Sequence, residues 1–264
     1  LYSKTYECNR WIMKFYFSNS KSKEATEVKE YLVSKYGQNQ PEDADIIVPI
    51  GGDGFMLKNL HDFHQLSKPF FGINCGSVGF LMNAKNDEDL EILVKQSHET
   101  ILYPLQMNAT DSNNKSFTSI AFNEVSMMRQ THQASKIKIK INEIERIKEL
   151  VCDGVLVATA AGSTAYNLSA HGSIIPLNSN LLALTPISAF RPRRWRGALL
   201  QHNTNIKFEV IDNINRPVSV TADHSEFRNI VKVDIISSQK SSCKILLDSK
   251  HSMEERVLKE QFYS

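Results

Sequence analysis

The first hundred residues alternate between strand-like and helix-like patterns of apolar positions. Residues 13–17 have the pattern of a strand, and residues 45–50 form a nearly continuous apolar run that is typical of a buried strand. Each run is followed by apolar residues at helical spacing, which are Ala25, Val28, Leu32 and Tyr36 before a closing Gly37, and then Met56, Leu57, Leu60 and Phe63. A third strand-like run covers residues 69–74. The alternation predicts a parallel sheet covered by helices, whose ligands would bind at the carboxyl ends of the strands.

From about residue 99 the apolar residues recur at every second position, which is the spacing of a β-strand. Ile137, Ile139 and Ile141 alternate with lysines, as in a half-buried strand. The further strand-like segments are residues 155–160, 206–211, 218–221, 231–236 and 245–247, and a helical stretch covers residues 252–261. The second half therefore predicts an antiparallel, β-rich domain. Because no Pro/Ser-rich linker separates the halves, we expect them to pack together with a cleft between them.

Composition narrows the class of protein. A chain of 264 residues with 41% hydrophobic and 23% charged residues is typical of a globular protein of one or two domains. The formal net charge of +2 gives no reason to expect a nucleic acid partner. No window offers about 18 consecutive apolar residues, and residues 1–10 lack the core of a signal peptide, so we expect no membrane association. Cys8, Cys75, Cys152 and Cys243 lie far apart, which favours free thiols in a reducing cytoplasm.

A glycine loop, Gly51-Gly52-Asp53-Gly54, lies where the second strand gives way to a helix. Glycines permit a sharp turn and the close approach of a bulky anion. A helix N-terminus offers free N–H groups and a positive dipole end to phosphate. Since a carboxylate repels phosphate, we expect Asp53 to act as a base or a metal partner beside it. The alternative is a tight turn in which Asp53 only caps the helix.

A second glycine loop covers residues 72–80. Neither loop has the spacing G-x-G-x-x-G, and the chain contains no G-x-x-x-x-G-K-[ST]. These absences argue against a conventional Rossmann dehydrogenase and against a P-loop enzyme.

Polar residues cluster at three later places. The pair Asn123-Glu124 follows an apolar run and can contact a ribose or an adenine edge, or lie at a solvated strand end. Asp153-Gly154 precedes residues 162–170, where small and hydroxylated side chains leave room for a flat ligand. The alternative for that segment is a turn capped by Ser163 or Thr164.

Three further groups of polar residues have no single predicted role or are expected at the surface. Arg191, Arg193, Arg194 and Arg196 surround Trp195 and suit phosphates, a subunit contact or a solvated loop. His61 and His64 lie three residues apart on the expected helix without a third metal ligand nearby, so we interpret both as surface residues. Asp223-His224 is either a turn or a polar pair at the cleft.

Taken together, these segments resemble the NAD kinases, ATP-dependent enzymes that phosphorylate the 2′-hydroxyl of the adenosine ribose of NAD. Residues 51–54 resemble the catalytic loop of that family, and residues 72–74 with 79–81 resemble its second glycine loop. Asn123-Glu124, Asp153-Gly154 and residues 162–169 follow in the family's order and spacing, within a match over residues 13–236. The first loop is shared with diacylglycerol kinases, sphingosine kinases and phosphofructokinases, and the later motifs make the resemblance specific.

The resemblance implies a fold and a set of ligands. It implies an α/β N-terminal domain with a parallel sheet, residues 1–98, and a β-rich, sandwich-like NAD-binding domain, residues 99–244, with residues 245–264 returning to the first. It implies NAD and ATP as substrates and Mg²⁺ bound with ATP through phosphates and water, without a metal site on the protein. It also implies a homodimer or homotetramer with NAD near a subunit interface.

By motif, the resemblance places Asp53 on the general base. It implies nucleotide contacts by Gly52, Gly54, Phe55, Asn74, Phe80 (an adenine wall), Asn123, Glu124, Asp153, Ala161, Thr164, Ala165, Tyr166, Ser169, Asp223 and His224. The sequence departs from the family pattern at Phe55, where Thr is usual, and at His171 and His224, where Gly is common. Two alternatives remain, which are a lipid or sphingoid kinase with the same first loop and a non-catalytic NAD-binding sensor. The hydroxyl-rich residues 163–169 argue against an acyl-chain cleft.

Overall fold

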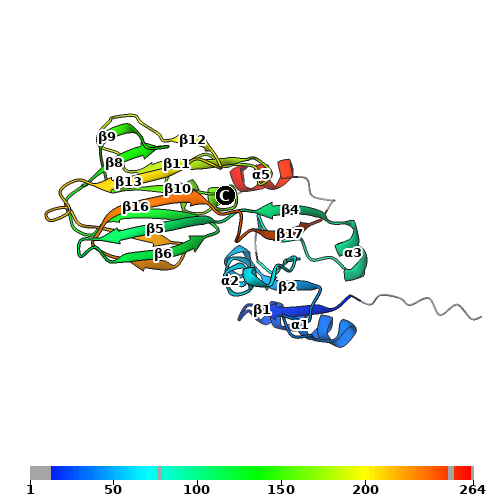
Figure 1. Ribbon diagram of the computed structural model, residues 1–264. Coiled ribbons are helices and arrows are strands. Elements are labelled where there is room, and N and C mark those ends of the chain that lie inside the picture. Colours follow the sequence, from blue (N-terminus) through cyan, green and yellow to red (C-terminus); the bar gives the residue numbers. More distant parts are fainter. Residues whose placement is uncertain (1–12, 77–78, 249–252, 263–264) are drawn as a thin grey trace, which may run out of the picture.

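A three-stranded parallel sheet forms the centre of the N-terminal half. The computed structural model describes residues 13–76, 79–248 and 253–262 (Figure 1). The sheet has the order β1-β2-β3, with helices between its strands. Its elements are β1 (Phe15–Asn19), α1 (Lys23–Tyr36), β2 (Ile46–Gly51), α2 (Asp53–Phe63), the 3-10 turn η1 (His64–Leu66), β3 (Ile73–Asn74) and α3 (Leu90–Gln96). The predicted parallel α/β architecture is confirmed.

The third predicted strand is shorter than the apolar run that suggested it. Only Ile73 and Asn74 pair with β2 as a strand, whereas Phe70 makes isolated bridges to Ile47 on one side and Ile245 on the other. Residues 69–74 therefore do not form one continuous strand beside β2, because Phe70 lies between the strands that contain Ile47 and Ile245.

Two antiparallel sheets of six strands form the C-terminal half, as the period-two pattern predicts. One sheet contains, in spatial order, β12 (Ala198–Gln201), β11 (Leu181–Ile187), β10 (Gly154–Ala158), β7 (Glu124–Arg129), β14 (Val218–Ala222) and β15 (Ser225–Phe227). The other contains β6 (Ser116–Ala121), β5 (Leu105–Asp111), β16 (Ile230–Ser237), β13 (Ile206–Val210), β8 (Ser135–Ile141) and β9 (Ile144–Cys152).

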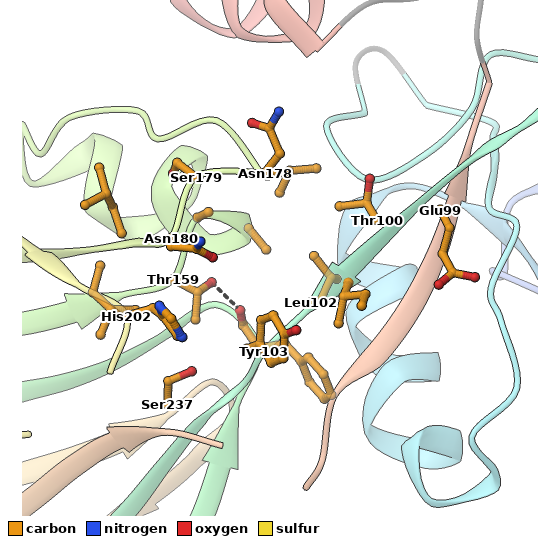
Figure 2. A pocket seen from close by; sticks show the side chains of 17 residues that line it. Glu99, Thr100, Leu102, Tyr103, Thr159, Asn178, Ser179, Asn180, His202 and Ser237 are labelled. Atoms are coloured by element: carbon orange, nitrogen blue, oxygen red, sulfur yellow. Dashed lines mark hydrogen bonds between the residues drawn. The ribbon is translucent and has the colours of Figure 1, made fainter. Parts of the chain in front are cut away.

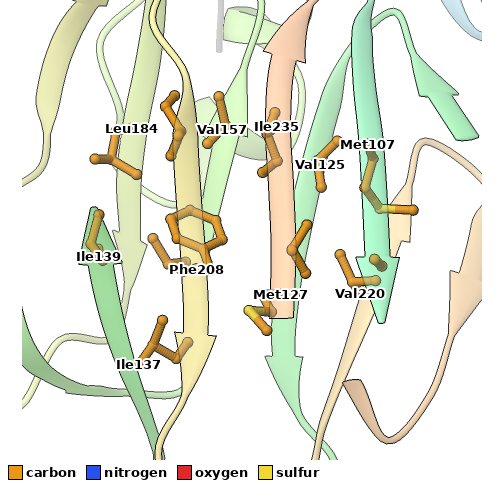
Figure 3. Packing of buried hydrophobic residues seen from close by; sticks show 14 of the residues in the cluster. Met107, Val125, Met127, Ile137, Ile139, Val157, Leu184, Phe208, Val220 and Ile235 are labelled. Atoms are coloured by element: carbon orange, nitrogen blue, oxygen red, sulfur yellow. The ribbon is translucent and has the colours of Figure 1, made fainter. Parts of the chain in front are cut away.

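The inner faces of these two sheets pack against each other. Phe208 and Ile139 from one sheet and Val157 and Leu184 from the other belong to a single buried cluster (Figure 3). Buried positions alternate with partly exposed ones along β8 and β13, so the period-two pattern produces this face of the sandwich core. β10, in contrast, is buried on both faces.

A two-stranded ribbon and a shared core join the halves. β4 (His98–Leu102) pairs antiparallel with β17 (Cys243–Leu247), and Phe70 exchanges backbone hydrogen bonds with Lys244 and Leu246, each 2.8 Å long. One buried cluster contains Met56 of α2 together with Phe122 from the second half. Helix α5 (Met253–Phe262) ends the described chain. The halves pack together as expected, while the boundary at residues 98 and 99 stays a prediction.

Candidate active site

Asp53 is the first residue of α2, and its carboxylate binds the second glycine loop. Its Oδ2 accepts a hydrogen bond from the N–H of Phe80 (2.7 Å) and its Oδ1 accepts one from the N–H of Leu81 (3.0 Å). The N-cap of α2 is Gly52, which makes no side-chain capping bond. Asp53 therefore does not cap its own helix, and that alternative is wrong. The two loops that the sequence singled out are joined through this one carboxylate.

The environment of Asp53 favours its protonated form more than water does. Burial raises the pKa of the Asp53 carboxyl, while the two backbone N–H groups and the positive charge of Arg256 partly offset this effect. A base works best when its pKa lies near the working pH, so a raised pKa suits Asp53 to accept a proton.

The glycines beside Asp53 leave open space and do not make an unusual turn. Among the described glycines, only Gly37 and Gly197 have a positive φ, so the chain passes from β2 into α2 without a left-handed residue. A Cβ added at Gly52 or Gly54 would meet no atom within 4 Å. The structure thus leaves room at the start of α2 for a group to approach the backbone closely.

The second glycine loop lies beside the first because β3 pairs with β2. Asn74 lies opposite Gly51 in the ladder, and the N–H of Cys75 donates to the Gly51 carbonyl (2.8 Å). Asn74 Oδ1 accepts from the N–H of Gly76 (3.0 Å), which fixes the side chain within its own turn. Residues 77 and 78 of this loop lie outside the described residues. The ring of Phe80 is 1% exposed, so in the structure its backbone N–H, not its ring, reaches Asp53.

Asp223 anchors the turn that contains Asn123 and Glu124. Its fully buried carboxylate accepts hydrogen bonds from the backbone N–H groups of Phe122 (2.7 Å), Asn123 (3.0 Å) and Glu124 (3.1 Å). The same carboxylate lies 2.7 Å from Nε2 of His61, near the end of α2. Asp223 is therefore a polar residue at the junction of the halves.

The interpretation of His61 as a surface residue is wrong. Its side chain is 15% exposed because it lies between the Asp223 carboxylate and the rings of Phe122 and His224, whose centroids are 5.2 and 4.7 Å away. His224, the second residue of the predicted pair, thus contacts α2 through His61.

Glu124 is an unusual carboxyl group in this turn. Burial, and then the negative charge of Asp223, raise the pKa of Glu124 to about 7. Within the part of the chain that the structure describes, its buried Oε2 has no hydrogen-bond partner. A buried polar atom without a partner is unfavourable, so this oxygen is well suited to bind a ligand donor.

The hydroxyl-rich segment packs directly against the Asn123 turn. Thr159 donates from its N–H to the Asn123 carbonyl (2.9 Å) and from its hydroxyl to the Phe122 carbonyl (2.6 Å). A Cβ at Gly162 would lie 2.2 Å from the Asn123 carbonyl oxygen, so this contact requires glycine. The segment forms the short 3-10 helix η2 (Ala161–Thr164) and the short helix α4 (Tyr166–Ser169).

Neither Ser163 nor Thr164 caps these turns, which rules out the capped-turn alternative. The N-caps are Ala160 for η2 and Ala165 for α4, and neither makes a side-chain capping bond. The Ser163 hydroxyl instead donates to the Ala160 carbonyl (2.7 Å).

Tyr166 lies in the field of two predicted site carboxylates. Burial, then the charges of Glu124 and Asp153, raise the pKa of the Tyr166 phenol. Asp153 forms an ion pair with Arg129, with 2.6 Å between Oδ1 and Nε. Ala161 is buried and Ser169 is exposed, so the segment 161–169 runs from the core to the surface. The carboxylates of Glu124 and Asp153 therefore both lie near the Tyr166 phenol.

A cavity of about 230 Å³ is lined by β4 on one side and by residues 177–182 on another (Figure 2). Its lining includes Thr159, Asn180, Tyr103 and His202 but not Asp53, Asn74 or Asn123. The cavity is therefore separate from the open space at the start of α2.

Among the described residues, no group of three or more His, Cys, Asp or Glu side chains is arranged to hold a metal ion. No described helix is long and apolar enough to cross a membrane. Cys75, Cys152 and Cys243 are free thiols, whereas Cys8 lies outside the described residues.

Three residues organise the site without having been assigned to it from the sequence: His61 was misinterpreted, and Thr159 and Arg256 were missed. His61 follows Asp53 on the same helix, and its spacing from Asp53 places it two turns further along, toward the second half. Thr159 lies in the predicted strand run but gives no signal of its own. Arg256 lies 203 positions after Asp53 (256 − 53), where no local pattern links it to the loop.

Comparison with known proteins places both halves in one family. The family model described as "ATP-NAD kinase N-terminal domain" matches residues 8–101, and the model described as "ATP-NAD kinase C-terminal domain" matches residues 122–247. The NAD kinase of Rhizobium meliloti (strain 1021) is 48% identical over 246 residues, which cover 93% of this chain and 96% of that protein. The NAD kinase of Caulobacter vibrioides (strain ATCC 19089 / CIP 103742 / CB 15) is 47% identical over 257 residues, with coverage of 97% and 99%.

Solved structures show the same fold. Yeast NADH kinase complexed with NADH aligns with a TM-score of 0.76 at 19% identity, covering 96% of this chain and 89% of that chain. An NAD kinase from Archaeoglobus fulgidus in complex with ATP aligns with a TM-score of 0.70 at 23% identity, covering 93% and 96%. At these identities the structures support the fold, and the family follows from the two domain models and the relatives near 48% identity. The resemblance seen in the sequence is confirmed, and the chain belongs to the ATP-NAD kinase family.

Proposed function

We propose that this protein transfers the γ-phosphoryl group of ATP to the 2′-hydroxyl of the adenosine ribose of NAD, giving NADP. Its membership of the ATP-NAD kinase family supports the substrates and the reaction. The observation that carries the chemistry is the Asp53 carboxylate, which two backbone N–H groups hold at the open start of α2. Matches to both halves favour this reaction over the lipid kinase alternative, which shares only the first loop.

Asp53 is the general base in this proposal. Phosphoryl transfer needs mainly positioning and charge stabilisation, together with a residue that accepts the proton of the attacking hydroxyl. Hydrogen bonds from Phe80 and Leu81 fix both oxygens of Asp53, and each oxygen keeps a lone pair for the 2′-hydroxyl. Proton transfer of this kind contributes roughly 10²- to 10⁴-fold to the rate.

The triphosphate of ATP binds at the start of α2. The first N–H groups of a helix have no intrahelical partner, and Gly52 supplies no side-chain cap. Gly52 and Gly54 leave space for phosphate oxygens to approach these N–H groups, with Phe55 and Asn74 beside them. Magnesium is part of the MgATP substrate in this proposal. Bound to ATP, it neutralises phosphate charge.

The adenosine of NAD binds beside the Asn123 turn. Asn123 and Glu124 contact the adenosine, with the unpartnered Oε2 of Glu124 as an acceptor or, when protonated, a donor. The remaining contacts come from Phe80, Asp153, Ala161, Thr164, Ala165, Tyr166, Ser169, Asp223 and His224, as the family resemblance implies.

Assembly and location are further parts of the proposal. The widely separated free thiols are consistent with a location in the cytoplasm. The exposed arginine cluster of residues 191–196 is consistent with a homodimer or homotetramer.

A coupled assay tests the proposed function. Purified protein with NAD, ATP and Mg²⁺ should form NADP, measured with an NADP-specific dehydrogenase. Binding of NAD without turnover would instead support the non-catalytic sensor, and phosphorylation of diacylglycerol or sphingosine would support the lipid kinase.

A further inference from the structure

Arg256 of α5 is a buried cation attached to the loop that holds Asp53. Its side chain is 6% exposed. Nη1 donates to the carbonyls of Phe80 (3.3 Å) and Met82 (2.6 Å), and Nη2 donates to Oδ1 of Asn83 (3.2 Å). These three hydrogen bonds fix residues 80–83 to Arg256, which lies near the other end of the chain.

One peptide group lies between the guanidinium of Arg256 and the carboxylate of Asp53. The carbonyl of Phe80 and the N–H of Leu81 belong to the same planar peptide unit. The carbonyl accepts from Arg256, and the N–H donates to Asp53 Oδ1 at 3.0 Å. A cation at the oxygen and an anion at the hydrogen polarise the amide in the same sense, so each hydrogen bond strengthens the other.

Among the described residues, the charged groups near this arrangement come from α2 and from the C-terminal segment. Arg256 is the ionisable group whose charge lowers the pKa of Asp53, because the other groups that bind its carboxylate are backbone N–H groups. Arg256 itself is influenced by Asp248, whose Oδ2 lies 3.9 Å from Nη2, by Asp53 and by Glu255. Lys58 of α2 is paired with Asp62 on the exposed side of that helix. Because Arg256 is buried, solvent screens its effect on Asp53 only weakly.

We propose that Arg256 is a positioning residue, which orients and polarises the Phe80–Leu81 peptide group. This peptide group then holds Asp53 as an anion that is ready to accept the proton of the attacking hydroxyl. This inference rests on the proposed role of Asp53 as the base. It assigns a catalytic consequence to the C-terminal helix, which none of the sequence motifs includes.

The pH dependence of the reaction tests this proposal. In Arg256→Gln the carboxylate loses the nearby positive charge, so its pKa rises and the acidic limb of the kcat/KM profile moves to higher pH. We expect a move of roughly 0.5–1 pH unit, which is less than the 1–3 units of a direct ion pair. Arg256→Lys keeps the charge and should hold the acidic limb near its wild-type position even where kcat falls. Arg216→Gln is the matched control, because Arg216 also donates to a backbone carbonyl, that of Ala134, in the other half of the protein.

A second measurement does not depend on turnover. At pH 8, Arg256→Gln should lower the denaturant midpoint of unfolding by more in the wild-type background than in the Asp53→Asn background, because only the wild type has the carboxylate. Equal shifts in both backgrounds, or an unmoved acidic limb with a uniform loss of kcat, would overturn the proposal and leave Arg256 a structural residue. If Asp53→Asn itself keeps high activity, the base assignment fails, whereas the unfolding comparison still decides whether Arg256 acts on Asp53.

Discussion

His61 Nε2 lies 2.7 Å from Asp223 Oδ2, and this contact joins residues 162 positions apart in the sequence. His61 belongs to α2, the helix that begins at Asp53. Asp223 in turn binds the backbone of Phe122, Asn123 and Glu124. One helix therefore presents the proposed base at its start and positions the proposed NAD-binding turn near its end.

Replacement of Asp223 should release this turn. In Asp223→Ala, three backbone N–H groups lose their acceptor at once, so we expect a loss of roughly 3 kcal/mol or more in the free energy of unfolding. The affinity for NAD should fall with it. Denaturant unfolding and NAD titration measure the two effects. Asp43→Ala is the control, since Asp43 lies in an exposed turn and should change stability by less than about 0.5 kcal/mol. Equal effects of the two substitutions would contradict the anchoring role.

Much of the fold follows from the apolar patterns. Strand and helix patterns around residues 13–63 predict the parallel sheet because each apolar run is long and closed by a glycine or by a change of period. β8 alternates between buried and partly exposed positions, as its isoleucine pattern predicts. β9 pairs with β8 but is mostly exposed, so its sequence carries little apolar signal and the strand was not predicted.

The site follows from the sequence only where its residues belong to a local motif. Gly51 to Gly54 is such a motif, and the structure joins it to the second loop through Asp53. His61 was misinterpreted because its partner, Asp223, is distant in the sequence and a histidine on a helix gives no indication of burial. Arg256 was missed for the same reason, since only the fold brings α5 to residues 80–83.

The raised pKa of Glu124 predicts a pH-dependent stability. A carboxyl group whose pKa is about 7 in the folded protein and about 4.5 when unfolded favours the folded state while it is protonated. Its deprotonation therefore destabilises the fold as the pH rises from about 4.5 to about 7, by an amount on the order of 3 kcal/mol.

The comparison of wild type with Glu124→Gln isolates this effect. Asp53 also has a raised pKa, so the wild-type curve alone mixes two groups. Gln has nearly the shape of the protonated acid, so the variant should match the wild type near pH 4, below the unfolded pKa, and exceed it in the free energy of unfolding at pH 8. Parallel curves over this range would show that Glu124 titrates normally.

Two glycines should respond to alanine in opposite ways. Gly54 lies in the first turn of α2 with no atom near its missing Cβ, so Gly54→Ala should keep stability or raise it by about 0.5–1 kcal/mol. The added methyl group would occupy the space proposed for phosphate, so the KM for ATP should rise severalfold. Gly162→Ala would force a Cβ to within 2.2 Å of the Asn123 carbonyl and should destabilise the protein by roughly 1–3 kcal/mol. Normal ATP kinetics in Gly54→Ala would place the triphosphate elsewhere.

Substitution of the proposed base should separate catalysis from binding. Asp53→Asn keeps the shape of the side chain but cannot take the proton, so kcat should fall by about 100-fold or more while NAD binding changes little. Asp62→Asn on the same helix is the control, because Asp62 makes an exposed ion pair with Lys58. Steady-state kinetics and NAD titration on both variants provide the test. A variant that keeps a tenth or more of the wild-type rate would show that Asp53 is not the base.

The arginine cluster lies in a loop between two strands at the edge of a sheet. Arg191, Arg193, Arg194 and Arg196 are all exposed, and the loop leads into β12, an edge strand. The exposed apolar side chains Phe190 (55%) and Leu199 (51%) flank the cluster. Apolar surface beside arginines suits a subunit contact, because arginine combines ion pairing with planar stacking.

Charge reversal in this loop tests whether assembly and NAD binding are linked. Arg193→Glu combined with Arg194→Glu should shift the protein towards smaller oligomers, since two positive side chains become negative at the proposed contact. The apparent KM for NAD should rise in the same preparation, because a pocket shared between subunits is incomplete when they separate. Light scattering and steady-state kinetics measure the two effects, and Arg146→Glu combined with Lys148→Glu on the exposed strand β9 controls for the change in net charge. A fully assembled variant with normal kinetics would assign the arginines to a solvated loop, and a smaller oligomer with an unchanged KM would place the NAD pocket within a single subunit.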